Sequence, residues 1–291
     1  MSAFTLLAQP FAEYGFMRRA LVASFAVGIG SAPIGTLLVL RRMSLVGDAM
    51  AHALLPGAAL GFLAAGFSLA AMSIGGFMAA LAVALAAGWV TRATAQREDA
   101  SFAAFYLIAL ALGVLLVSTH GSSVDLMRVL FGSILAVDDA ALLLMAGVAS
   151  VTLVVLAAVY RPLVVECLDP GFLRSVGGGG SRVHMLFLVL AVANLVAGFQ
   201  ALGSLMAVGL MMLPATAARF WAGEVWSLAL AATLIAMLSG VVGLLLSFHA
   251  EWPSGPAIVL VAGAIYLLSV IAAPREGLLW RRLHRNRHRA A

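Results

Sequence analysis

Uninterrupted apolar stretches recur along almost the whole chain, and they restrict its fold more than any other feature. A helix needs about 20 apolar residues to cross the roughly 30 Å hydrocarbon core of a bilayer. Backbone amides and carbonyls find no water in lipid, so each crossing segment must close its hydrogen bonds within a helix. We predict nine spanning helices, at residues 20–40, 45–66, 69–91, 101–118, 140–160, 183–200, 203–220, 225–248 and 256–273.

The composition agrees with a protein that is embedded in a membrane. Charged residues make up 10% of the 291 residues, against about a quarter in soluble domains, and the mean hydropathy is +1.10. The single cysteine, Cys167, excludes an internal disulfide and a cysteine metal cage. The predicted fold class is all-α, a polytopic membrane helix bundle that forms one transmembrane domain over residues 1–291.

The distribution of basic residues predicts the orientation of the chain. All 17 lysine and arginine positions are arginine. If the C-terminus is cytoplasmic, nine spans place 14 of these 17 arginines inside, in line with the excess of basic residues in cytoplasmic loops. The N-terminus then lies outside, where Arg18–Arg19 fits poorly and belongs either to an interfacial helix or to a miscounted span.

Two segments outside the spans are expected in the cytoplasm. Residues 161–182, RPLVVECLDPGFLRSVGGGGSR, form the longest non-apolar interruption, and we predict a short helix on the membrane face followed by a flexible glycine hinge. Residues 275–291 form a basic tail that is expected to lie at the lipid surface. The pI near 10.3 therefore indicates anionic lipid neighbours, and no nucleic acid partner is expected.

Asp48 and His52 are the two ionisable residues inside an otherwise apolar span. Their i, i+4 spacing places them on one helix face. His52 follows Arg42 by ten residues, which in a continuous helix is roughly 15 Å, near the middle of the bilayer. An aspartate at the centre of a spanning helix costs at least ~2.5 kcal/mol and usually marks an ion or proton path.

The pair has two interpretations. It supplies one oxygen and one nitrogen ligand to a divalent cation such as Zn²⁺ or Mn²⁺, or its members only bond to each other and to neighbouring helices. Pro56 and Gly57 follow directly and are expected to loosen the helix beyond the candidate ligands.

Other candidate ligands are weaker. Asp125, in the outer loop, either receives metal from outside or is a solvated charge paired with Arg128. Met206, Met211 and Met212 are soft donors, but at helical spacing methionines are more often packing residues.

Residues 41–63, RRMSLVGDAMAHALLPGAALGFL, resemble the signature of the zinc/manganese ABC importer permeases. They contain an arginine, Gly-Asp-Ala, a histidine four residues after the aspartate and then Pro-Gly. Further segments resemble the other landmarks of that family, in the family's order: 98–118, 130–137, 168–177, 203–220 and 247–261. The resemblance covers about residues 20–274.

The resemblance implies a helical permease related to the vitamin B12 and siderophore importers. It implies a second copy of the chain as the other half of the pathway, cytoplasmic ATP-binding subunits, and a periplasmic or extracellular metal-binding protein. By this resemblance, Asp48 and His52 belong to the metal path. The resemblance also carries the ATPase contact onto 168–177, with these coupling residues: Asp169, Pro170, Arg174 and Gly177.

The predicted function is therefore ATP-driven import of a divalent metal ion across the bacterial inner membrane. His52 favours zinc over manganese as the cargo, and no permanently bound cofactor is expected. The chain has no phosphate-binding loop and no lysine to build one, so a separate subunit must hydrolyse ATP. The alternative is an ion- or proton-coupled carrier that works without an ATPase. An intramembrane metalloenzyme would need more ligands on facing helices.

Overall fold

The computed structural model describes residues 7–43, 46–66, 68–94, 96–120, 137–175, 179–275 and 277–278. Every regular element in these ranges is an α-helix. The helices are α2 (Gln9–Glu13), α3 (Gly15–Leu40), α4 (Val46–Ala65), α5 (Leu69–Ala93), α6 (Glu98–His120), α8 (Asp139–Ala158), α9 (Tyr160–Leu168), α10 (Pro170–Ser175), α11 (Gly180–Leu202), α12 (Ser204–Ala218), α13 (Val225–Ala250) and α14 (Ser254–Ala272).

Within the described ranges, eight helices are long and apolar enough to cross a membrane. This confirms the all-α polytopic bundle. The remaining predicted span, 203–220, is the shorter apolar helix α12, which has 15 residues and is about 22 Å long. It turns back from α11 at Gly203, whose φ of 81° and ψ of 164° suit glycine and almost no other residue.

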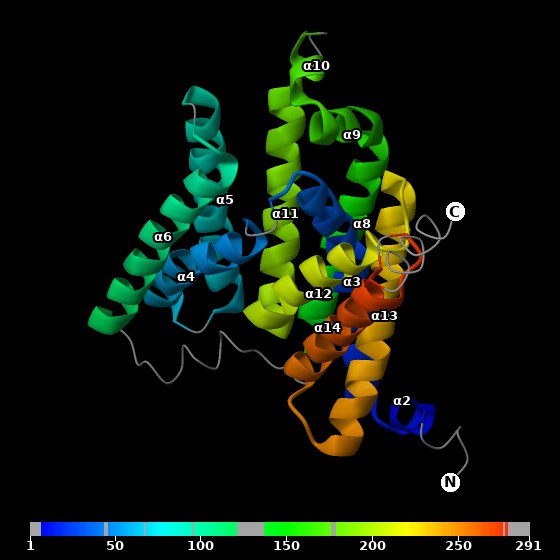
Figure 1. Ribbon diagram of the computed structural model, residues 1–291. Coiled ribbons are helices and arrows are strands. Elements are labelled where there is room, and N and C mark those ends of the chain that lie inside the picture. Colours follow the sequence, from blue (N-terminus) through cyan, green and yellow to red (C-terminus); the bar gives the residue numbers. More distant parts are fainter. Residues whose placement is uncertain are drawn as a thin grey trace, which may run out of the picture.

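Helix α3 is the centre of the bundle (Figure 1). In its apolar 18-residue window 83% of the residues are buried, against 22% for α5, α6 and α8. Small residues make this possible, because a methyl group at Gly35 would come within 1.9 Å of the Met211 carbonyl oxygen on α12. Small residues let spanning helices approach closely in lipid, so the run around Gly35 fixes where α12 lies.

The Arg18–Arg19 doublet lies in the first turns of α3, which begins at Gly15. The Arg19 guanidinium stands 3.7 Å from the Asp139 carboxylate at the start of α8, and both side chains are exposed. Long basic side chains at a helix end reach toward the polar interface, so the doublet fits the end of a span.

Helices α4 and α5 cross at glycines. A Cβ at Gly57 would lie 2.0 Å from the Gly75 carbonyl oxygen, and one at Gly75 would lie 2.2 Å from the Gly57 carbonyl oxygen. Helix α4 also continues through Pro56 to Ala65. Gly57 therefore has a packing role, and the loosening of α4 by Pro56 and Gly57 stays a prediction.

We expect Gly57→Leu to destabilise the protein by at least about 1–3 kcal/mol, the usual cost of overpacking a close contact. Gly263→Leu is the matched control, because nothing lies within 4 Å of a Cβ at Gly263. Denaturant unfolding of both variants in detergent measures the difference. Equal stability of the two variants would contradict the close α4–α5 crossing.

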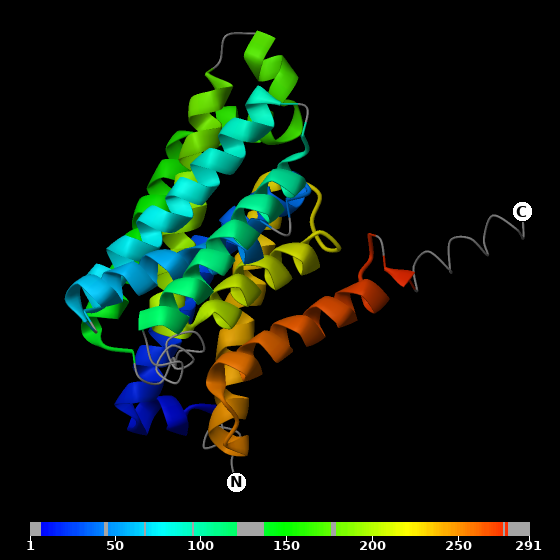
Figure 2. The ribbon, with the colours of Figure 1, turned by 90° about the vertical axis from the view of Figure 1, so that its left-hand side faces the viewer.

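Two short helices, α9 and α10, lie at the end of the bundle opposite α2 (Figures 1 and 2). The predicted single helix in 161–182 is thus divided at Asp169, because Pro170 disfavours helical backbone in the residue before it. The Asp169 carboxylate accepts a hydrogen bond from the Phe172 amide at 2.9 Å. Asp169 is therefore the N-terminal cap of α10. Most of the predicted basic tail, 275–291, lies outside the described residues.

Candidate metal site

The candidate ligands lie near the start of α4. Asp48 is in the first turn, where the helix dipole stabilises a carboxylate. Ala51 and His52 follow at i+3 and i+4 and share its face. Since α4 begins at Val46 and does not continue the preceding helix, His52 lies only about 9 Å along it. The continuous helix from Arg42 is therefore wrong, and the depth of His52 in the bilayer stays a prediction.

This face of α4 forms one wall of a cleft of about 460 Å³. Helix α12 supplies the facing wall with residues from Ser204 to Leu213 that recur once per turn, and α14 supplies one more residue. The lining residues are Asp48, Ala51, His52, Ser204, Leu205, Val208, Gly209, Met212, Leu213 and Val259. Asp48 and His52 are the ionisable members of this lining, and apart from Ser204 the other side chains in it are apolar.

The two side chains are close but are not locked together. His52 Nε2 lies 3.7 Å from Asp48 Oδ1, which is longer than a hydrogen bond. Two ligands about 2.1 Å from one tetrahedral ion stand roughly 3.4 Å apart, so a small side-chain movement would let both reach the same cation. Mutual hydrogen bonding is not the role that this geometry favours.

Both candidate ligands face an open side of the molecule. In the apolar window of α4 72% of the residues are buried, yet the Asp48 side chain is 62% exposed and that of His52 is 38% exposed. A carboxylate facing hydrocarbon at this position is costly. Water, an ion or another protein surface must therefore cover this face.

Neighbouring residues hold His52 in place. The Tyr106 ring on α6 stacks on the imidazole, with centroids 6.0 Å apart and planes at 30°. Pro56 has no amide hydrogen, so the His52 carbonyl lacks the usual helical donor four residues later. The ring is supported on one side, and the amide that would donate to the His52 carbonyl in a regular helix is absent.

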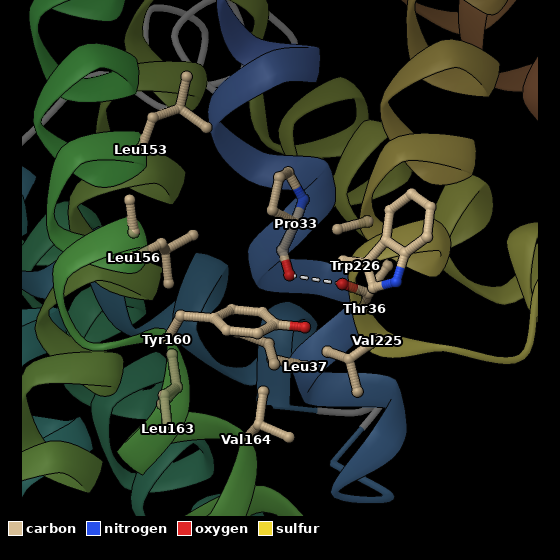
Figure 3. A pocket seen from close by; sticks show the side chains of 12 residues that line it. Pro33, Thr36, Leu37, Leu153, Leu156, Tyr160, Leu163, Val164, Val225 and Trp226 are labelled. Atoms are coloured by element: carbon tan, nitrogen blue, oxygen red, sulfur yellow. Dashed lines mark hydrogen bonds between the residues drawn. The ribbon is translucent and has the colours of Figure 1, made fainter.

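A second hollow, of about 240 Å³, lies between α3, α8, α9 and α13 (Figure 3). Tyr160 and Trp226 line it among aliphatic side chains. None of its lining residues carries a carboxylate, imidazole or thiol. Its chemistry does not suit a metal ion.

The other predicted site residues are only partly described. Asp125 and Gly177 lie outside the described residues. Pro170 and Arg174 belong to α10. Of the three methionines, Met206 and Met211 are fully buried, whereas Met212 lines the cleft.

The second wall of the cleft and the support behind His52 were not predicted from the sequence. The signal for the wall was present, since the cleft-lining positions of α12 repeat at helical spacing within 203–220. Nothing in the sequence distinguishes Tyr106 from the other aromatic residues of the spans.

The ABC 3 transport family matches residues 13–273. The chain belongs to this family. It is therefore a multi-pass membrane subunit of a bacterial ABC transporter and is not itself the ATPase, which confirms those predictions.

Relatives of this permease share its length. The manganese import system permease protein ScaB of Streptococcus parasanguinis is 32% identical over 268 residues, which are 91% of this chain and 93% of ScaB. The chelated iron transport system membrane protein YfeC of Yersinia pestis is 32% identical over 274 residues, which are 94% and 92% of the two chains.

A solved structure has the same fold. PsaBC from Streptococcus pneumoniae in complex with Fab aligns with a TM-score of 0.81 and 28% identity, over 93% of this chain and 96% of the PsaBC chain.

Proposed function

We propose that this permease imports a first-row divalent metal ion, and that the ion passes Asp48 and His52. The observation that carries the proposal is the exposed carboxylate and imidazole on one face of α4, in a cleft that is otherwise mostly apolar. The names of ScaB and YfeC, which refer to manganese and chelated iron, support a metal cargo.

A second copy of the chain completes the site in this proposal. In the part of the chain that the structure describes, no cluster of three or more His, Cys, Asp or Glu side chains can hold a metal. A two-fold axis along the open face of α4 would bring two aspartates and two histidines together. Four such ligands suit a tetrahedral or an expanded metal site, and the second copy would cover the exposed pair.

The identity of the cargo depends on the same ligands. Imidazole favours zinc, and carboxylate oxygens favour manganese. Zinc stays the predicted preference on the strength of His52, while the names of the relatives favour manganese or iron. An uptake experiment in which Mn²⁺, Fe²⁺ and Zn²⁺ compete decides which of these metals the permease prefers.

Helices α9 and α10 are the proposed contact with the ATP-binding subunit. The side chains of Leu168 and Phe172 are 65% and 57% exposed, although this segment lies beyond the apolar spans. Exposed apolar side chains that cluster outside the membrane indicate a protein partner. The arginine distribution supports a cytoplasmic location for this end of the bundle, and in this proposal α2 lies outside.

The test of the function uses vesicles that contain the permease, its ATP-binding subunit and its metal-binding protein. We expect uptake of Mn²⁺, Fe²⁺ or Zn²⁺ that requires ATP and is unaffected by an imposed proton gradient. Uptake driven by the proton gradient without ATP would instead support the carrier that works alone.

A second prediction concerns docking. Phe172→Asp should remove most of the co-purifying ATP-binding subunit, because it places a charge in the proposed apolar contact. Trp252→Asp, at an equally exposed aromatic residue between α13 and α14, is the matched control and should leave co-purification unchanged. Equal retention of the ATP-binding subunit by both variants would move the contact away from α10.

A further inference from the structure

Arg41 directly follows a predicted span, where a solvent-exposed loop arginine is expected, but its side chain is buried. It follows the last residue of α3, and its side chain is only 6% exposed. The guanidinium lies 3.3 Å from the Glu166 carboxylate on α9, which is itself 4% exposed. A charge pair this deeply buried carries a desolvation cost that loop charges avoid.

A third buried side chain completes the cluster. Arg41 Nη1 lies 2.5 Å from Nδ1 of His184 on α11, which is fully buried. A guanidinium only donates hydrogen bonds, so Nδ1 of His184 accepts and its proton is on Nε2. The Phe187 ring, also on α11, stands 5.6 Å from the Arg41 guanidinium carbon. Arg41 is therefore held from two helices at once.

The cluster connects the two functional regions of the permease. Glu166 lies one helical turn before Asp169, the cap of α10. Arg41 lies between the end of α3 and the start of α4, the helix that carries Asp48 and His52. Close packing beside Glu166 keeps the connection stiff, because a Cβ at Gly180 would lie 2.5 Å from Glu166 Oε2.

We propose that the Arg41–Glu166–His184 cluster transmits movement of α9 and α10 to the start of α4. This inference rests on the proposed function, in which the ATP-binding subunit pushes on α10. An exposed ion pair exchanges with water and transmits little force. A buried, forked arginine loses its partners only at a high cost, so a displacement of α9 moves the α3–α4 junction with it.

These residues act by positioning and do not touch the metal. Without the cluster, ATP hydrolysis should continue, but movement of α9 and α10 should no longer change the cleft beside α4. In the reconstituted complex, we expect Glu166→Gln and Arg41→Gln to lower the metal imported per ATP hydrolysed by at least about fivefold, the lower end of measured coupling between sites. Glu166→Gln nearly preserves the side-chain shape. Arg41→Lys keeps the charge and should therefore have a metal-to-ATP ratio between those of Arg41→Gln and the wild type.

Arg42→Gln is the matched control, because Arg42 is the exposed neighbour of Arg41. The double variant Arg41→Gln/Glu166→Gln should lose no more than Arg41→Gln alone, since Arg41→Gln already removes the interaction with Glu166. Wild-type metal per ATP in an assembled Glu166→Gln complex would overturn the inference. A parallel fall of uptake and hydrolysis, which indicates only a structural role, would do the same. A wild-type complex that imports no metal would overturn the proposed function itself, and this inference with it.

Discussion

Replacing either Asp48 or His52 by alanine is expected to abolish metal uptake while the permease still assembles with its ATP-binding subunit. Loss of a residue that only supports a metal ligand costs about 10–100-fold in affinity or activity, so loss of a ligand should cost at least as much. Stability should hardly change, because the Asp48 side chain is 62% exposed and that of His52 is 38% exposed in the single chain. Metal uptake and co-purification, measured on the same preparations, separate the two effects.

Two control substitutions change the same residue types outside the cleft. Asp139 starts α8 and His249 ends α13, and both are exposed and absent from the lining of the cleft. Asp139→Ala and His249→Ala should import metal normally. Normal uptake by both Asp48→Ala and His52→Ala would remove the pair from the pathway.

The second large effect concerns the open face of the cleft. Leu205 lines the cleft and is 46% exposed. If a second copy covers this face, Leu205→Cys should form a cross-linked dimer of twice 30.1 kDa with a short bifunctional maleimide or an oxidant. Cross-linking by the oxidant should also stop uptake until a reductant is added, because it blocks relative movement of the two copies.

Leu234→Cys is the control for cross-linking. Leu234 is 58% exposed on α13 and is not part of the cleft lining. The native Cys167 is buried and should stay unreactive in both variants. Efficient cross-linking of Leu234→Cys together with none of Leu205→Cys would place the partner on another face.

Much of the fold follows from the sequence because a bilayer leaves few choices. The apolar stretches have to be helices, and their lengths match the described ones closely, as in 45–66 against Val46–Ala65. Asp48 and His52 stand out because ionisable side chains are expensive in lipid. The family follows from several motifs in a fixed order, none of which is specific alone.

The sequence could not provide what depends on contacts between distant helices. The cleft wall from α12 exists because Gly35 lets α12 approach α3 closely. Arg41 resembles any loop arginine until Glu166 and His184, 125 and 143 residues away along the chain, are brought against it. Such pairings are set by tertiary packing and cannot be predicted from hydropathy.

The most direct test is the structure of the complete transporter with Mn²⁺ or Zn²⁺ bound, with the ion located by its anomalous scattering. The account predicts one ion on the axis between two copies, with carboxylate and imidazole atoms of Asp48 and His52 from both copies at about 2.0–2.2 Å. An ion bound elsewhere, with Asp48 and His52 turned toward lipid or away from the axis, would contradict it.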